Sequence, residues 1–254
     1  MRASARRLAI VTLACLVSAC GSILGPTNVD KNWHTYEAEH FTLYVRPGSF
    51  AESNHVRLGE VLDDQYSYTQ QILGVTYAGR VSAFLYNNAS DGDLESDRSG
   101  VAYADSEALR ATAAPPLDGN LFALLQHEFN HVIQRNTLGR PGTYFVNEGL
   151  PSAVQSTRYH SFGKDFYYAW TKNHLAAIPP LSDLTDDDKW TGDDVAYKAS
   201  ASFLAYLIDL AGPAPIKHLY QTRSAEFAAK IQSLYGRPLA ELEQDWRAFC
   251  AAHG

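Results

Sequence analysis

Two histidines and a glutamate near the middle of the chain have types and spacing suited to metal chemistry. The segment His127-Glu128-Phe129-Asn130-His131 has the pattern H-E-x-x-H. On a helix, residues i and i+4 lie on one face, so both histidines can hold one divalent ion from successive turns. Glu128 lies one position further round, within reach of a water bound to that ion. The pattern therefore predicts a metal site that activates water for hydrolysis.

A catalytic zinc ion usually has three protein ligands, and Glu148 is the candidate for the third. It lies in the segment Asn-Glu-Gly-Leu over 147–150, which opens an expected helix. Sixteen residues separate His131 from Glu148, and they include Gly139 and Gly142. These glycines allow the chain to turn and return antiparallel, so that Glu148 faces the histidines. Alternatively, an acid at this position is simply favoured by the helix dipole.

With these residues in place, the chain resembles the gluzincin metallopeptidases, specifically the peptidase MA-like family. That family has H-E-x-x-H, a short connection, and then a Glu followed by Gly-Leu. The resemblance covers roughly residues 80–250. It implies a zincin-like fold and one Zn²⁺ ion held by His127, His131 and Glu148. It also implies peptide-bond hydrolysis, with Glu128 as the general base that takes a proton from water.

The resemblance extends to two further parts of the expected site. Tyr197 lies in the segment 196–207, which resembles the helix that follows the metal site in this group. It takes the position of a tyrosine whose hydroxyl points at the scissile carbonyl, where a phenol can stabilise an oxyanion. Gly100, Val101 and Ala102 lie in an expected strand. We expect this strand to supply the sheet edge along which gluzincins align extended substrate.

Two departures from the family pattern bear on the expected activity. Aminopeptidases of the same clan grip a free amino terminus with a Gly-x-Met-Glu-Asn segment, but here Met1 is the only methionine. This departure therefore favours an endopeptidase. Some gluzincins also place an acid four residues after the ligand glutamate to orient a histidine, whereas this chain has Ser152. The partners of the outer ring nitrogens are not specified by the sequence.

Two other functions remain compatible with these residues. A chain with this fold can serve as a catalytically silent binding or scaffolding module. The same atoms can also hydrolyse a non-peptide amide of the cell wall. Zinc content measured together with peptide cleavage separates the binding module from the peptidase.

The elements that must position these residues read as strands first and helices later. Alternating β-forming residues predict strands at 40–45, 80–86, 100–104 and 109–113. Helical periodicity predicts helices at 50–73, 121–135, 146–155, 194–210, 216–222, 225–235 and 239–252, with a connection at 176–194. Asp118 or Asn120 is expected to cap the helix that carries the histidines. The apolar face of that helix, Leu125, Phe129, Val132 and Ile133, is expected in the core. The predicted fold class is α+β, with a small mixed N-terminal sheet followed by a mostly helical half.

The first twenty residues have the features of a bacterial export signal. Three arginines precede an apolar run over 8–17, and the end, Val-Ser-Ala-Cys, resembles the lipobox of bacterial lipoproteins. In that family the cut falls before the cysteine, here Cys20, and its sulfur receives a diacylglycerol. We therefore expect a signal peptide over 1–19, a tether over 20–35 and the metalloprotease domain over 36–254. The expected location is the cell envelope, facing the periplasm from the outer membrane if the host is Gram-negative.

Composition narrows the classes of partner. The 254 residues are 46% hydrophobic and 19% charged, which is typical of a globular protein and excludes a disordered or collagen-like chain. A net charge of −7 lacks the basic footprint of a nucleic-acid-binding protein. Three cysteines are too few for a disulfide scaffold. The expected partners are a peptide or protein substrate and a membrane, reached through the N-terminal lipid anchor; the oligomeric state is not indicated.

Overall fold

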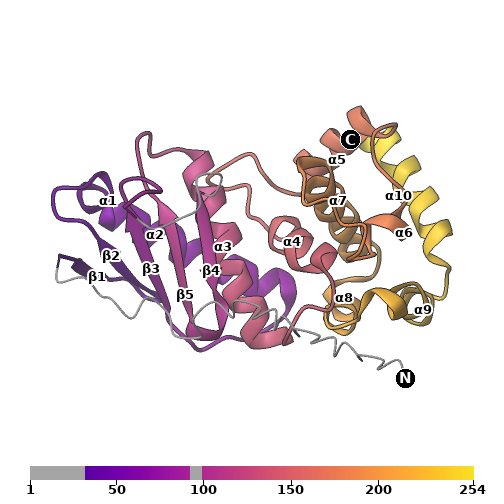
Figure 1. Cartoon of the computed structure of the whole chain (residues 1–254), viewed down its shortest axis with the longest axis horizontal. Coiled ribbons are helices and arrows are strands. Elements are labelled where there is room, and N and C mark those ends of the chain that lie inside the picture. Colours follow the sequence, from indigo (N-terminus) through magenta and orange to yellow (C-terminus); the bar gives the residue numbers. More distant parts are fainter. Residues whose placement is uncertain (1–31, 92–98) are drawn as a thin grey trace, which may run out of the picture.

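A mixed sheet followed by a helical half makes up the computed structural model, which describes residues 32–91 and 99–254 (Figure 1). The predicted α+β class is confirmed. The predicted signal peptide over 1–19 and Cys20 lie outside the described residues. The first strand begins at His34, two residues before the expected start of the domain.

The sheet has the strand order β1-β2-β3-β5-β4. The strands are β1 (His34–Glu37), β2 (Phe41–Val45), β3 (Val81–Tyr86), β4 (Gly100–Tyr103) and β5 (Ala108–Thr112). The central strands β2, β3 and β5 are parallel, whereas β1 and β4 are antiparallel to their neighbours. The four strands predicted from the sequence are confirmed, and β1 is an addition. Among the described strands β4 is an edge strand, so no described strand pairs with the other side of its backbone.

Ten α-helices lie within the described residues. They are α1 (Phe50–Ser53), α2 (His55–Leu73), α3 (Gly119–Leu138), α4 (Tyr144–Ala153), α5 (Lys164–His174), α6 (Leu181–Leu184), α7 (Asp194–Ala211), α8 (Pro213–Leu219), α9 (Ser224–Tyr235) and α10 (Leu239–His253). Every predicted helix is present, although the first divides into α1 and α2. Helix α5 was not predicted, and the expected connection at 176–194 contains the short α6.

Helices α2 and α3 cover one face of the sheet (Figure 1). The four apolar residues predicted on the core face of α3 are all fully buried. The Phe129 ring meets the Phe41 ring of β2 edge-on, with centroids 5.3 Å apart. Burial of side chains of this size contributes about 1.5–3 kcal/mol each, so the core fixes which face of α3 points away from the sheet. His127 and His131 lie on that outer face.

Helix α4 lies between α3 and α7 (Figure 1). Gly149 permits this packing, because a Cβ atom there would come within 2.7 Å of the Ser200 side chain on α7. A second core fills the helical half and includes Trp246 of α10, whose indole donates to Ser202 Oγ at 3.0 Å. The close α4–α7 contact brings the start of α7 opposite the outer face of α3.

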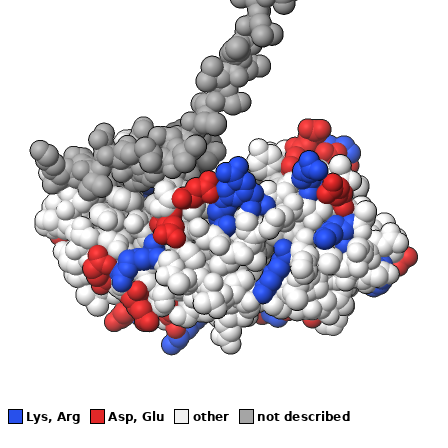
Figure 2. Space-filling model, turned by 90° about the horizontal axis from the view of Figure 1, so that it is seen from below, with Lys and Arg blue, Asp and Glu red and all other residues white. Residues whose placement is uncertain are grey.

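Charged groups on the surface are mixed in sign. In the view from below, Lys and Arg side chains alternate with Asp and Glu rather than forming one broad patch (Figure 2). Exposed pairs such as Lys164 with Asp209, at 2.8 Å, contribute little individually to stability. None of the helices in the described parts of the chain is long and apolar enough to cross a membrane.

Candidate metal centre

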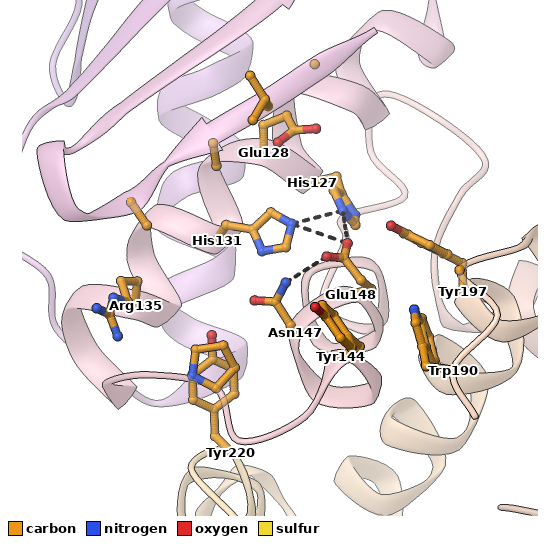
Figure 3. A pocket seen from close by; sticks show the side chains of 16 residues that line it. His127, Glu128, His131, Arg135, Tyr144, Asn147, Glu148, Trp190, Tyr197 and Tyr220 are labelled. Carbon is orange, nitrogen blue, oxygen red and sulfur yellow. Dashed lines mark hydrogen bonds and ion pairs between the residues drawn. The ribbon is translucent and has the colours of Figure 1, made fainter. Parts of the chain in front are cut away.

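The structure brings His127, His131 and Glu148 together, as the sequence predicted. The two histidine Nε2 atoms lie 3.1 Å apart. Glu148 Oε2 lies 3.5 Å from Nε2 of His127 and 3.7 Å from Nε2 of His131. Helix α3 supplies both imidazoles, and α4 supplies the carboxylate (Figure 3).

These separations fit a tetrahedral zinc ion. Bonds of 2.0–2.1 Å at the tetrahedral angle place neighbouring ligand atoms about 3.3 Å apart. Three electron-rich atoms this close repel one another unless a cation or a proton lies between them. Two imidazoles and one carboxylate are also a donor set that zinc prefers, and they leave a fourth position for water or substrate. The residues present therefore fit a zinc ion with one coordination position left open.

The start of α3 and its contacts with other helices hold the histidines in place. The Asp118 carboxylate caps the helix and accepts from the backbone N–H of Asn120 at 2.9 Å, so Asp118 is the capping residue. One of the unspecified positions of the motif, Asn130, is fully buried and connects three helices. Its amide oxygen accepts from Thr69 on α2 at 2.8 Å, and its Nδ2 donates to the Pro151 carbonyl on α4 at 2.8 Å. Asn130 therefore fixes α4, and with it the ligand glutamate, against α3.

Glu148 is held by its neighbours on α4. The helix begins at a Thr143 cap, whose hydroxyl accepts from the Val146 N–H at 3.2 Å. Asn147 Nδ2 donates to Glu148 Oε1 at 2.6 Å, which leaves Oε2 facing the histidines. The sequence motif included Asn147 but did not assign it a role. Its amide orients the carboxylate so that one oxygen is available to a metal.

Ser152 provides the partner of the outer ring nitrogen of His127. Its Oγ lies 3.0 Å from His127 Nδ1, at the position where the family resemblance places an acid. We assign the proton to Nδ1, since Nε2 faces the other ligands. Ser152 and the buried Tyr167 of α5 line an adjoining cavity together with His127, and the Tyr167 hydroxyl donates to Gln155 Oε1 at 3.0 Å. A neutral serine hydroxyl thus orients His127, where a charged carboxylate would do so in the family pattern.

Replacing Ser152 by alanine is expected to weaken zinc binding about 10–100-fold, the usual effect of losing a partner that orients a metal ligand. The reason is that His127 loses the acceptor that fixes its tautomer and ring orientation. Competition with a chromogenic chelator measures the change. The matched control is Ser202→Ala, which removes another buried serine hydroxyl away from the site. Equal losses in both variants would mean that stability, rather than ligand orientation, is responsible.

The ionisation of the three groups is coupled. Burial lowers the pKa of His131 to about 3. Burial alone would raise the pKa of Glu148, but the hydrogen bond with His127 and electrostatic attraction from the two imidazoles lower it to about 2. Burial also opposes the charged form of His127, yet the two nearby glutamates raise its pKa above the ordinary value. Near neutral pH, Glu148 is therefore ionised and His131 is neutral, as zinc ligands must be.

Glu128 lies beside the ligands, under the edge strand. The residue is 8% exposed and lines the same cavity as the histidines. A Cβ atom on Gly100 would come within 3.0 Å of the Glu128 side chain, so the strand approaches the carboxylate closely only because residue 100 is glycine. Gly100, Val101 and Ala102 of β4 all line this cavity, and their role in substrate binding stays a prediction.

Replacing Gly100 by valine is expected to reduce turnover about 100-fold, because a displacement of about 1 Å in a catalytic group has an effect of this size. The new side chain would push the Glu128 carboxylate away, while the zinc ligands stay in place. Kinetics and zinc content of the same preparation check both parts. Ser99→Val, which places the same branched side chain at the exposed residue just before the strand, should leave both unchanged. Loss of zinc from the Gly100 variant would show that it disrupts more than Glu128.

The cavity around these groups has a volume of about 670 Å³. Tyr197, in the first turn of α7, lines it, and its hydroxyl points toward His127 and Glu148 from the opposite wall (Figure 3). The Trp190 ring lies beside it, with centroids 5.9 Å apart. Tyr197 therefore lies where the sequence predicted it, and its catalytic role stays a prediction.

Among known proteins, this chain matches solved structures but matches no protein family in sequence. No protein-family model matches the sequence, and no curated protein matches it. Among solved structures, an aminopeptidase N family protein from Idiomarina loihiensis matches with a TM-score of 0.37 and 9% identity. The match covers 85% of this chain and 40% of the other, so this chain spans less than half the length of that protein.

Proposed function

We propose that this protein is a zinc-dependent peptide hydrolase of the gluzincin type, acting as an endopeptidase. The observation that carries the proposal is the convergence of His127, His131 and Glu148 in an open cavity that also contains Glu128 and Tyr197. A purely structural zinc site is normally closed by four protein ligands. Three ligands facing an open cavity favour catalysis instead.

The residues divide the work of peptide hydrolysis. A bound zinc ion would polarise the scissile carbonyl and increase the acidity of water. Glu128 takes the proton from the attacking water as the new C–O bond forms. It then delivers this proton to the amine nitrogen as the C–N bond breaks. Tyr197 donates a hydrogen bond to the carbonyl oxygen as that oxygen gains negative charge.

The lining of the cavity supports endopeptidase rather than aminopeptidase activity. An aminopeptidase needs a carboxylate to bind the free α-ammonium group of its substrate. Among the described residues that line the cavity, the only acids are Glu128 and Glu148, and both already have roles. The open edge of β4 can instead pair with the backbone of an extended chain that continues in both directions.

We also propose that the protein is exported and anchored to the cell envelope by a lipid on Cys20. The support is the sequence alone, namely the basic head, the apolar run over 8–17 and the lipobox that ends at Cys20. Its substrates would then be peptides or proteins outside the cytoplasm.

Zinc analysis followed by mapping of cleavage sites tests the enzymatic proposal. The full chain is purified, its zinc content is measured, and it is incubated with a proteome-derived peptide pool. We expect one zinc ion per chain and new internal cleavage sites in mass spectra, which disappear with a chelator and return with added zinc. Stoichiometric zinc without any cleavage would contradict the proposal and favour a binding module.

A further inference from the structure

One end of the cavity carries a positive charge that the proposed mechanism does not use. Arg135 lies four residues after His131 on the same face of α3, and its side chain lines the cavity. In Figure 3 it lies at the end of the cavity opposite Tyr197 and Trp190. A cation inside a substrate cavity indicates a group that recognises negative charge on the substrate.

The guanidinium of Arg135 forms a hydrogen bond with Asp105 through its Nε edge. Nε donates to Asp105 Oδ1 at 2.6 Å, and the side chain is only 16% exposed. Within the described residues, no acceptor forms a hydrogen bond with its two terminal Nη groups. Arg140, which is 82% exposed, also approaches Asp105, at 3.8 Å. The Asp105 carboxylate thus lies beside two guanidinium groups, so the cluster of Asp105, Arg135 and Arg140 has a net positive charge.

A phenol lies next to this arginine. The Tyr220 side chain lines the cavity, and in Figure 3 it lies below Arg135 and Asn147 with its hydroxyl pointing toward them. Burial raises the pKa of Tyr220 well above its usual value, and the charge of Arg135 opposes that rise. The hydroxyl therefore stays protonated and can donate a hydrogen bond. A guanidinium and a phenol together suit a carboxylate, which accepts from both.

The distance from the metal site can be expressed in substrate residues. Four residues of α-helix rise about 6 Å, whereas an extended peptide advances about 3.3–3.6 Å per residue. Strand β4 follows α3 over this stretch, since Gly100 lies against Glu128 and the Ala104 carbonyl accepts from Asn136 at 3.0 Å. A chain paired with β4 would therefore present a side chain to Arg135 about two residues from the scissile bond.

We propose that Arg135, assisted by Tyr220, binds a carboxylate of the substrate about two residues from the scissile bond. The preferred substrates are then peptides with Asp or Glu at that position. This inference rests on the proposed peptidase function. It also runs against the net charge of −7, which would by itself repel acidic peptides. The preference therefore arises from local contacts in the cavity.

Cleavage-site mapping with Arg135→Gln tests this inference. For the parent chain we expect Asp and Glu to be enriched about two residues to one side of the cleaved bonds. On a matched pair of synthetic peptides with Glu or Gln there, the variant should lose about 10–100-fold in kcat/KM for the Glu peptide only. Arg135→Lys should recover part of the loss. Arg57→Gln, which removes an exposed arginine of α2 that does not line the cavity, should behave as the parent does.

The alternative explanation is that Arg135 only stabilises the turn after β4, through its hydrogen bond with Asp105. Asp105→Asn distinguishes the two explanations. If Arg135 only stabilises the turn, Arg135→Gln and Asp105→Asn should each cleave the Glu peptide and the Gln peptide equally slowly. That result, or equal cleavage of both peptides by the parent, would overturn the inference. Binding of arrayed Glu and Gln peptides to the zinc-loaded Glu128→Gln chain gives a readout without turnover. If the parent cleaves nothing, the proposed function fails, whereas equal binding to both arrays overturns the carboxylate preference.

Discussion

Replacement of Glu128 by glutamine is expected to leave zinc binding intact and to lower the rate of peptide hydrolysis about 10²–10⁴-fold, the usual contribution of a general base. Glutamine has nearly the same shape as glutamate, so it fits beside Gly100 without displacing the edge strand. It cannot take a proton from water. The ligand atoms belong to His127, His131 and Glu148, so the metal should remain.

The measurement combines kcat/KM on a peptide found by cleavage mapping with zinc analysis of the same sample. Glu226→Gln on α9 is the matched control, since it makes the same chemical change at an exposed residue far along the chain. Hydrolysis by the Glu128 variant at the rate of the parent would show that another group acts as base. Loss of zinc would instead show that Glu128 helps to hold the metal.

The metal ligands could be predicted from sequence because their placement depends on local geometry. The i and i+4 spacing fixes two imidazoles on one face of any helix, and the buried apolar face of α3 decides which way they point. The prediction of Glu148 needed one further step, namely that the chain turns after Gly139 and returns toward the histidines. The short connection between α3 and α4 leaves few other arrangements, and the structure has the expected one.

The groups that orient these ligands could not be predicted in the same way. Ser152 meets His127 only because α4 packs across α3, and Tyr167 joins them from α5, a helix that sequence reasoning missed. The segment Lys164–His174 is rich in aromatic residues, which have only a middling preference for helix. Such contacts arise from packing between distant segments, and no local pattern encodes them.

Asn130 shows a similar limit within the motif itself. The pattern H-E-x-x-H leaves its position unspecified, and an asparagine in a helix is usually exposed. Here it is fully buried and joins α2 to α4. A buried polar side chain must find partners, so a signal did exist: a polar residue next to the buried Phe129. The identity of those partners still required the tertiary structure.

Removal of the Glu148 carboxylate is expected to have the largest effect on the metal itself. The free energy of zinc binding in small domains is about 10–16 kcal/mol, and four ligands share it. We therefore expect Glu148→Gln to weaken zinc binding about 10²–10³-fold. The neutral amide is a poorer ligand, and the site loses the charge that balances a dication. Turnover should fall with the zinc content and recover in part when zinc is added in excess.

Thermal unfolding with and without zinc gives an independent measurement. A ligand that binds only the folded state stabilises it by about 2.7 kcal/mol at a concentration one hundred times its Kd. At one fixed zinc concentration the parent should therefore show a clear rise in Tm, whereas Glu148→Gln should show little. Glu226→Gln again controls for the loss of one carboxylate. If the Glu148 variant gains as much in Tm as the parent, the third ligand is another residue, and the open tetrahedral site on which the peptidase proposal rests does not exist.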